Sequence, residues 1–460
     1  MRLGLKIAMV VAMTLTILVP LMMIRGVINE RQGYRDEVVR DIAGNFGGRQ
    51  VVGGPVLVVP YVESEAVEVT GDDGVVRKTV RRSERQWTFF PDRLVMEGEL
   101  KPETRSRGLH KVRVYQWHGT AQARFDVRIP DDGGEGRQRV IGQPWLSYGI
   151  ADVRGLAGTP ALQVNGTAMA VAQGIGHADG PGVHVRFPVP ASGSRLLLDA
   201  RLAMDLRGTE SFSMMPYAKD NELRLSSRWP HPKFEGLSPQ KDIGSDGFRA
   251  SWRIAAVATN AQRRYLQNPS MAPEKTLPDQ PRRQVESMPW SPAGDSVSVS
   301  LIDPVNPYLQ AERATKYGLL FVALTFVGFF MFELVKQLPV HPIQYLLVGL
   351  AIAIFFLLLV SLSEHLAFGL SYLVAACACI GLIAFYLSSV LRSRARGLGF
   401  AAMLATLYAA LYGLLLSEDN ALALGAGLLF VVLAAIMVAT RKVDWYQVSA
   451  RVGSPSASGS

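Results

Sequence analysis

The sequence contains very little cysteine. Cys377 and Cys379 are the two cysteines among its 460 residues, and both lie in one apolar run toward the C-terminal end. This scarcity excludes a small scaffold held together by disulfides. Because the two residues are two positions apart, a helix would point them to different faces. We expect both to be packing residues, not metal ligands.

Motifs that carry familiar catalytic chemistry are also missing. The chain has no G-x-x-x-x-G-K-[ST], no H-E-x-x-H, no C-x-x-C pair and no G-x-S-x-G. His177 and His184 occur in the stretch GIGHADGPGVH, but neither a third histidine nor an H-x-E pattern accompanies them, which favours a loop over a metal site. We therefore expect a protein without enzymatic activity, cofactor or metal.

Long apolar runs, by contrast, are abundant. A helix that crosses a bilayer needs about 20 apolar residues, and six runs approach or meet that length. The first run ends in LMMIRGVINER, without the small residues of a signal-peptidase site, so we expect an uncleaved anchor. The six runs cover residues 7–24, 317–335, 343–362, 366–390, 398–416 and 421–440. The sequence predicts a polytopic membrane protein with six spans, one followed by five.

The charges of the connections predict an orientation. KQLPVHP, LRSRARG and the tail starting RKVDWY are basic, whereas the intervening connections SEH and SEDN are acidic. Basic connections collect in the cytoplasm, so we expect both termini inside and residues 25–316 outside. Arg25, Arg31 and Arg35 follow the first span and count against this orientation, but Glu30, Asp36 and Glu37 accompany them.

The net charge of +9 is divided unevenly between the predicted outer segment and the predicted cytoplasmic segments. Residues 25–316 hold 39 basic and 34 acidic side chains, a net charge of only +5, and the remaining positive charge lies on the cytoplasmic side. The basic balance therefore reflects membrane topology. With no base-reading motif present, we expect the lipid bilayer as a partner and no nucleic acid.

The large segment between the first two spans has the pattern of a β-rich domain. Residues 66–80 and residues 110–129 each resemble a hairpin, and further strands are predicted at 196–206, 247–255 and 296–302. Many short strands separated by Gly and Pro favour one β-sandwich or two small ones. Residues 264–295 contain six prolines and little pattern, so we expect a loop or linker there.

Three polar residues of the membrane region are candidate functional residues. Glu333 lies inside the second span, where a carboxylate is a functional candidate by default, although pairing with Lys336 or reaching the interface would also explain it. Glu364 and His365 form a three-residue connection with Ser363. They could bind or transfer a proton or bind a cation, or they could simply form a polar turn between antiparallel helices.

His231 is the fourth candidate. It lies between two prolines in RWPHPKFEG, where a rigid binding loop and a turn that closes a strand are both compatible with the pattern.

Several ordered segments resemble a known family. The chain resembles the CreD family of bacterial inner-membrane proteins from near its N-terminus to DWY at 444–446. The resemblance rests on the following segments: IRGVINERQGYR (24–35), GGPVLVVPY (53–61), ADVRGL (151–156), VNGT (164–167), SRWPHPKFEG (227–236), RATKYGLLFVALTF (313–326), HPIQYLLVGL (341–350), SEH (363–365) and RKVDWY.

The resemblance implies a layout and a role. The residues predict an anchor (1–24), a periplasmic β-rich domain (25–316), a five-helix bundle (317–440) and a cytoplasmic tail (441–460) that is disordered at its end, and this order resembles the family layout. Family members are linked to cell-envelope integrity and envelope stress, without an established catalytic set. We expect a non-enzymatic protein whose periplasmic domain binds an envelope partner. The alternatives are a transporter or channel component that uses polar residues of the bundle, and a membrane-anchored lipid or cell-wall enzyme.

Overall fold

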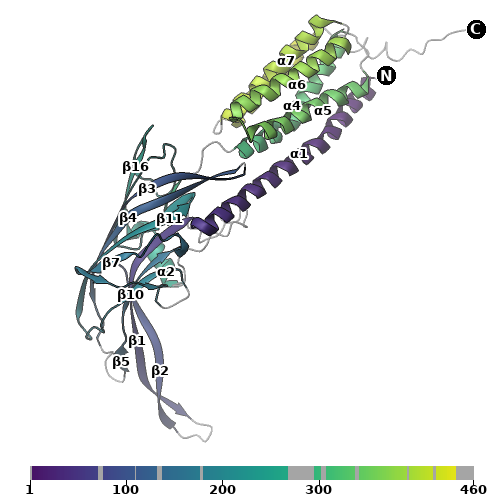
Figure 1. The fold of residues 1–460 in the computed structure, drawn as a ribbon. Helices are drawn as coiled ribbons and strands as arrows, with labels where there is room; N and C mark the ends of the chain where they lie inside the picture. The colour runs from purple at the N-terminus through teal and green to yellow at the C-terminus, as the bar shows by residue number, and fades with distance from the viewer. Residues whose placement is uncertain are drawn as a thin grey trace, which may run out of the picture. The chain divides into compact units, whose positions relative to one another are not determined.

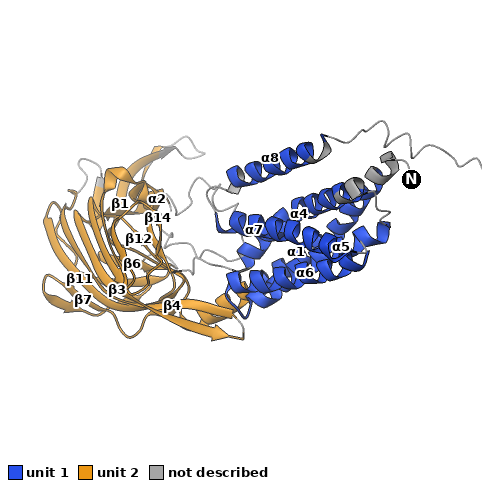
Figure 2. Ribbon diagram, turned by 90° about the horizontal axis from the view of Figure 1, so that it is seen from above, with its two compact units in different colours: residues 1–34, 305–460 blue, residues 35–304 orange. Residues whose placement is uncertain are grey.

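The computed structural model divides into two compact units, which are coloured separately in Figure 2. We call residues 1–34 and 305–460 the helical unit, and residues 35–304 the β unit. The structure describes residues 3–70, 76–108, 110–131, 137–176, 180–267, 295–301, 307–336, 341–390, 393–417 and 421–441.

The helical unit is built from long apolar helices. They are α1 (Leu3–Phe46, shared with the β unit), α4 (Pro307–Lys336), α5 (Pro342–Ser363), α6 (Phe368–Val390), α7 (Arg394–Leu416) and α8 (Ala421–Thr440). Five of the helices in the described residues are long and apolar enough to cross a membrane, and α8 contributes a shorter described stretch, Ala423–Val438. The prediction of a polytopic helical protein with a β-rich domain is confirmed.

Local sequence signals explain where these helices begin and how they pack. His341 caps α5 and exchanges hydrogen bonds with its first turn, and Pro342 follows at a position where no amide hydrogen is needed. Phe355, Phe356 and Tyr408 are buried where α4, α5, α6 and α7 meet. Large apolar side chains on the outer faces stay exposed, as expected for helices whose surroundings are lipid.

Cys379 is a packing residue as expected, whereas the exposed Cys377 is not. Cys379 is buried, and its Sγ lies 3.1 Å from the Tyr408 hydroxyl and 3.3 Å from the Ala351 carbonyl oxygen. Cys377 is exposed and free. Their different surroundings confirm that two residues spaced by two on a helix face different directions.

The β unit contains two mixed sheets. Among the described residues, sheet A has nine strands and sheet B has eight. Sheet A runs β14-β17-β12-β1-β6-β10-β9 with β2 and β5 also paired to β1, and sheet B runs β15-β16-β13-β3-β4-β11-β7-β8. Most neighbours are antiparallel, but β1 pairs with β12 and β3 pairs with β13 in parallel. Figure 1 shows how the long strands form the unit.

The strand bounds follow the chain order. In sheet A they are β1 (Gln50–Thr70), β2 (Val76–Phe89), β5 (Arg137–Ile141), β6 (Trp145–Ile150), β9 (Ala172–Gln173), β10 (Gly182–Arg186), β12 (Ser211–Met215), β14 (Lys233–Gly236) and β17 (Val297–Ser300). In sheet B they are β3 (Arg93–Arg107), β4 (His110–Arg128), β7 (Ala161–Val164), β8 (Thr167–Met169), β11 (Arg195–Thr209), β13 (Asp220–Ser227), β15 (Gln240–Gly244) and β16 (Gly247–Ala255).

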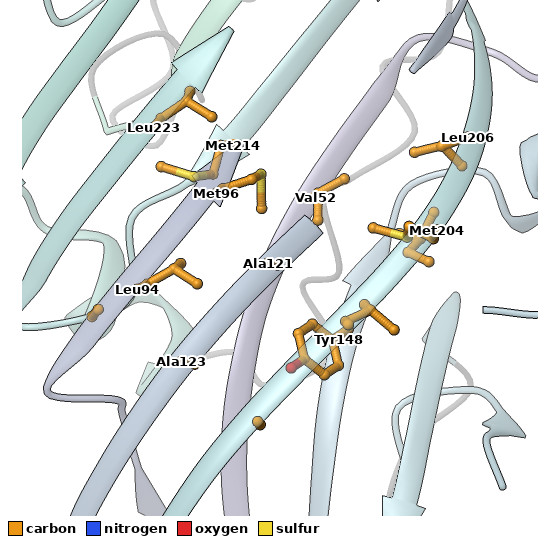
Figure 3. Close-up of a cluster of buried hydrophobic side chains, with 14 of the residues drawn as sticks. Val52, Leu94, Met96, Ala121, Ala123, Tyr148, Met204, Leu206, Met214 and Leu223 are labelled. Carbon is orange, nitrogen blue, oxygen red and sulfur yellow. The ribbon is translucent and has the colours of Figure 1, made fainter. Parts of the chain in front are cut away.

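A single apolar core joins the two sheets. Val52, Tyr148 and Met214 of sheet A belong to the same buried cluster as Met96 and Leu206 of sheet B, and Figure 3 shows these side chains together. Alternating burial along β4 and β16 supplies one face of that core. The structure therefore has one sandwich, and the alternative of two small sandwiches is wrong.

The predicted hairpin at residues 110–129 is also wrong. These residues form one continuous strand, β4, paired with β3 on one side and β11 on the other. Gly119 lies in mid-strand opposite Gly98, and the Trp117 ring lies across both glycines. A Cβ at either position would come within 2.2 Å of that ring, so the glycine here makes room for a buried indole.

The other strand predictions agree with the structure. Residues 66–70 and 76–80 belong to the antiparallel pair β1 and β2, and residues 71–75 lie outside the described residues. The predicted strands at 196–206 and 247–255 correspond to β11 and β16, and β17 (Val297–Ser300) lies within the predicted strand at 296–302. The predicted linker at 264–295 begins inside the short helix α2 (Ala261–Gln267), and residues 268–294 lie outside the described residues.

Candidate functional site

The acidic connection SEH forms a tight turn between two neighbouring helices. Glu364 follows the last residue of α5 in a helical backbone conformation. The amides of His365 and Leu366 donate to the Leu362 carbonyl oxygen at 3.0 and 2.9 Å, which ends the helix, and α6 begins at Phe368. A turn this short requires the two helices to be antiparallel neighbours.

The Glu364 side chain turns back into the helical unit. Its carboxylate is 8% exposed and lies 3.5 Å from Arg31 Nε of α1. The Tyr308 hydroxyl of α4 donates to the same carboxylate at 3.2 Å. We call Arg31, Tyr308 and Glu364 the clasp, because the three side chains connect α1, α4 and the turn after α5.

Each contact of the clasp contributes a modest free energy. Arg31 is 44% exposed, so its ion pair with Glu364 is partly screened by water and contributes about 1 kcal/mol. The uncharged tyrosine hydroxyl adds a hydrogen bond to the carboxylate, which contributes about 1 kcal/mol. Such a group can keep three helices together, and it can also let them separate at a modest cost in free energy.

His365 does not join the clasp. It is adjacent to Glu364 in sequence, but its side chain is exposed. Neighbouring residues in a turn point in different directions, so the pair suggested by the sequence is separated in the structure.

Glu333 lies in a second polar position of the helical unit. The residue is 5% exposed, and the Tyr345 hydroxyl of α5 donates to its carboxylate at 2.7 Å. The sequence suggested Lys336 as its partner, but the Lys336 side chain lies outside the described residues. Tyr345 is fully buried against Phe326 and Phe329, so this hydrogen bond sits in an aromatic environment.

His231 lies on the surface of the β unit. Its carbonyl oxygen accepts a hydrogen bond from Trp229 Nε1 at 2.9 Å, and its exposed ring meets the Trp229 ring edge to face. The Arg113 guanidinium lies over the Trp229 indole, 4.0 Å from the ring centroid. The segment before β14 is therefore a structured loop. His231 belongs to the β unit, whereas Glu333, Glu364 and His365 belong to the helical unit.

The glycine-rich histidine stretch is partly described. His184 is buried in β10, where its Nδ1 pairs with the Gly174 carbonyl oxygen at 2.9 Å, and His177 lies outside the described residues. No cluster of three or more His, Cys, Asp or Glu side chains arranged for a metal occurs within the part of the chain that the structure describes.

A buried carboxylate that sequence reasoning missed anchors the C-terminal end of α1. Glu210 is 3% exposed, and it binds Arg49 at 2.6 Å and Arg35 at 3.0 Å. Its backbone has φ +63°, an unusual conformation for a residue other than glycine. Burial alone would raise the pKa of Glu210, but Arg49 and Arg35 outweigh it and hold the pKa below its ordinary value.

A second polar group lies beside it in the same unit. The Gln50 amide donates to the carbonyl oxygens of Asp152 and Arg207 at 3.0 and 2.8 Å. The Asp152 carboxylate accepts from the Gly48 amide and from the Arg154 guanidinium. Burial would raise the pKa of Asp152, but these donors lower it overall.

Part of this arrangement had a signal in the sequence. ADVRGL at 151–156 supplies Asp152 and Arg154, and it is one of the segments that resemble a known family. Gly155 is required there because a Cβ would lie 2.2 Å from the Arg207 carbonyl oxygen. Glu210 had no such signal, since an isolated carboxylate between two strands looks like a surface residue.

Comparisons with known proteins agree with the fold and with these segments. A family model described as "Inner membrane protein CreD" matches residues 2–446. The inner membrane protein CreD of Escherichia coli (strain K12) is 33% identical over 440 residues, which cover 95% of this chain and 92% of that protein. With its apolar helices of membrane length, the chain is a multi-pass inner-membrane protein, and it belongs to the CreD family.

Proposed function

We propose that this protein helps to maintain the cell envelope under stress, with the β unit binding an envelope partner and the helical unit holding it at the membrane. In this proposal the protein acts by binding and not by catalysis. The β unit lies in the periplasm and both termini lie in the cytoplasm, as the basic and acidic connections indicate.

The observation that carries the proposal is the double attachment of helix α1. Residues 3–34 of α1 belong to the helical unit, where Arg31 joins the clasp, and residues 35–46 belong to the β unit, where Arg35 binds Glu210. One helix thus takes part in a polar cluster in each unit. A change of state in the clasp would reach the same helix that is anchored in the sandwich.

Charge reversal of the clasp tests this role. In a strain that lacks the gene, the native chain should restore resistance to envelope stress, and Arg31→Glu or Glu364→Arg alone should fail to do so. The double variant should recover a large part of the resistance, because the ion pair is restored with its charges exchanged. His365→Ala is the matched control in the same turn, and membrane levels of each variant should be measured in parallel.

Two results would contradict the proposal. A deletion strain with normal resistance to envelope stress would remove the proposed role itself. Full resistance with both single reversals, at normal membrane levels, would show that the clasp is only a helix contact.

A transporter or channel component is the second candidate function, because the buried pair of Glu333 and Tyr345 places a carboxylate inside the helical unit. If that carboxylate carried a proton or an ion, Glu333→Gln should abolish the resistance that the native chain restores while leaving membrane levels unchanged. Under the binding role, the glutamine variant should restore resistance fully.

A further inference from the structure

Strands β1, β2 and β5 form an arm of the β unit. Beyond residue 60, β1 pairs with β2 on one side and with β5 on the other. Figure 1 shows β1 and β2 running outward together, away from the other strands of the unit. We call residues 61–70, 76–86 and 137–141 the arm.

The strands of the arm alternate in charge. The outer part of β1 is acidic and β2 is basic, with cross-strand ion pairs from Glu63 to Arg85 at 3.4 Å and from Glu68 to Lys78 at 3.8 Å. On the other side of β1, Arg139 of β5 binds the buried Glu63 at 2.8 Å. The order across the arm is therefore basic β5, acidic β1, basic β2.

The outer edge of β2 has no strand beside it within the described residues. β2 pairs with β1 from Val76 to Phe89, and it has no second neighbour in the described part of sheet A. Arg81 and Arg82 are exposed, and no described carboxylate pairs with either. An edge of this length offers a row of backbone groups to an incoming strand.

Charge selects which strand can occupy that edge. A second copy of β2 would bring arginines against arginines, so the cations oppose self-association of this edge. An acidic strand would meet Lys78, Arg81 and Arg82 from the open side, as β1 meets β2 from the other side. In the register of β1, Glu65 lies opposite Arg81 and Glu68 lies opposite Lys78, and such directly opposite pairs are about 5 Å apart between Cβ atoms.

We propose that the free edge of β2 is a docking site for an extended acidic segment of an envelope protein, which adds as a further strand to sheet A. Backbone hydrogen bonds supply affinity that is independent of sequence, and the cations supply the preference for acidic residues. The inference rests on the proposed binding function and names the surface and the chemistry of its partner.

The acidic part of β1 provides a ready probe. Residues 61–70, with the sequence YVESEAVEVT, already pair with β2 inside the protein, so the probe is a fluorescent peptide of this sequence. Added to the full-length protein in detergent at low salt, it should bind and raise the fluorescence anisotropy. A peptide with its three glutamates replaced by lysine should bind at least about tenfold more weakly, because attraction at three positions becomes repulsion.

Two methylated peptides separate strand addition from simple charge attraction. Alternate amides of a strand point to opposite edges, so N-methylation of one alternate set blocks pairing with β2 and methylation of the other set leaves it free. One methylated peptide should lose binding and the other should keep it. Equal binding of both peptides would overturn strand addition.

Variants of the protein locate the site. Arg81→Glu with Arg82→Glu should weaken binding of the native peptide about tenfold, because two attractive pairs become repulsive. Lys241→Glu in β15, another edge strand with exposed residues, should change it less than twofold. Both variants are at exposed positions, and unchanged tryptophan fluorescence should confirm that the β unit is folded.

The remaining outcomes distinguish this inference from the proposed function. Absence of peptide binding overturns the docking site, and it leaves the clasp experiment and the envelope role standing. If the arginine variant abolishes binding to vesicles that contain anionic phosphatidylglycerol while the peptide does not bind, the surface recognises lipid, and the peptide inference is wrong. Loss of the envelope role with peptide binding intact would refute the proposed function but keep the site.

Discussion

The two units treat buried acidic side chains differently. In the β unit, Glu63 and Glu210 are 4% and 3% exposed, and each is bound by two arginines. In the helical unit, Glu333 receives a tyrosine hydroxyl, and Glu364 receives a tyrosine together with a half-exposed arginine. The comparison shows two arginines on each of these carboxylates in the sandwich, and a tyrosine hydroxyl on each of the two carboxylates among the helices.

The physical reason is the cost of burying charge. A paired carboxylate in the sandwich keeps arginines that are themselves partly exposed, as Arg49 is at 47%. A guanidinium within a membrane core is far more costly to bury, whereas a tyrosine donates a hydrogen bond without a charge. The units therefore respond differently to mutation, and the following experiments would sharpen or break that contrast.

The largest effect is expected at the glycine pair of the sandwich core. Gly119→Val should destabilise the β unit by about 3 kcal/mol, because the new side chain occupies the place of the buried Trp117 ring. Six of the seven tryptophans lie between residues 87 and 290, so tryptophan fluorescence during denaturant unfolding reports on this unit. Gly44→Ala is the control, since a Cβ there meets nothing within 4 Å. Equal stability of the valine variant would mean that Trp117 can leave its position at no cost.

Glu210→Gln should destabilise the β unit by about 2 kcal/mol. The change leaves two arginines without their carboxylate, and the figure is reduced from that of a fully buried pair because Arg49 is half exposed. The same fluorescence measurement applies. Glu103→Gln removes an exposed pair with Arg105 and should cost less than about 0.5 kcal/mol. If the two variants lost equal stability, the two arginines at Glu210 would stabilise the β unit no more than an exposed ion pair does.

The stability of the β unit should fall as the solution is acidified. The pKa of Glu210 in the folded protein is lower than its ordinary value of 4.5, so its stabilising contribution is complete above about pH 4.5. The contribution is lost as the pH falls through the lowered folded pKa. When the pH is lowered from 5 to below the folded pKa of Glu210, the native protein should therefore lose more stability than the Glu210→Gln variant. Parallel pH profiles of the two proteins would contradict this assignment.

A smaller effect is expected at the buried glutamate of the helical unit. Glu333→Gln keeps a hydrogen-bonding oxygen for Tyr345 and should lower the stability of this unit by about 1 kcal/mol or less. Reaction of a thiol-specific dye with buried Cys379 during heating, in a Cys377→Ser background, reports on unfolding of these helices. Destabilisation as large as that of Glu210→Gln would show that the carboxylate charge itself stabilises the helical unit.

The smallest effect is expected at His365. Its side chain is exposed and does not join the clasp, so His365→Ala should change the stability of the helical unit by less than about 0.5 kcal/mol. The Cys379 reaction measures this change too. Tyr308→Phe is the comparison, because it removes a hydrogen bond to Glu364 and should cost about 1 kcal/mol. A larger loss of stability from His365→Ala than from Tyr308→Phe would show that the histidine contributes to the contacts of the clasp.

Much of the fold could be predicted because its signals are local. Apolar runs identified the membrane helices, and alternation identified β11, β16 and β17. The hairpin predicted at 110–129 was wrong because alternation along a strand does not show whether the chain turns back, and a glycine such as Gly119 can lie beneath an indole in mid-strand. The number of sandwiches could not be predicted either, since it depends on which strands share a core.

The candidate site was predictable only in part. Glu333 and Glu364 stood out because carboxylates are rare in apolar sequence, but Tyr345, Arg31 and Tyr308 come from distant positions on other helices. Glu210 was missed entirely, because nothing in its neighbourhood distinguishes a buried carboxylate from an exposed one. Long-range contacts of this kind depend on how the elements pack.

By itself, the sequence determined a membrane protein with apolar helices, a β-rich segment without cysteine, and the family to which the chain belongs. Each of these depends on composition and period along the chain, where neighbouring residues carry the information. Only the tertiary structure decided that Glu364 faces Arg31 while His365 does not, and that Glu210 anchors α1. Those outcomes depend on side chains brought together from distant positions, where burial sets the free energy of every charge.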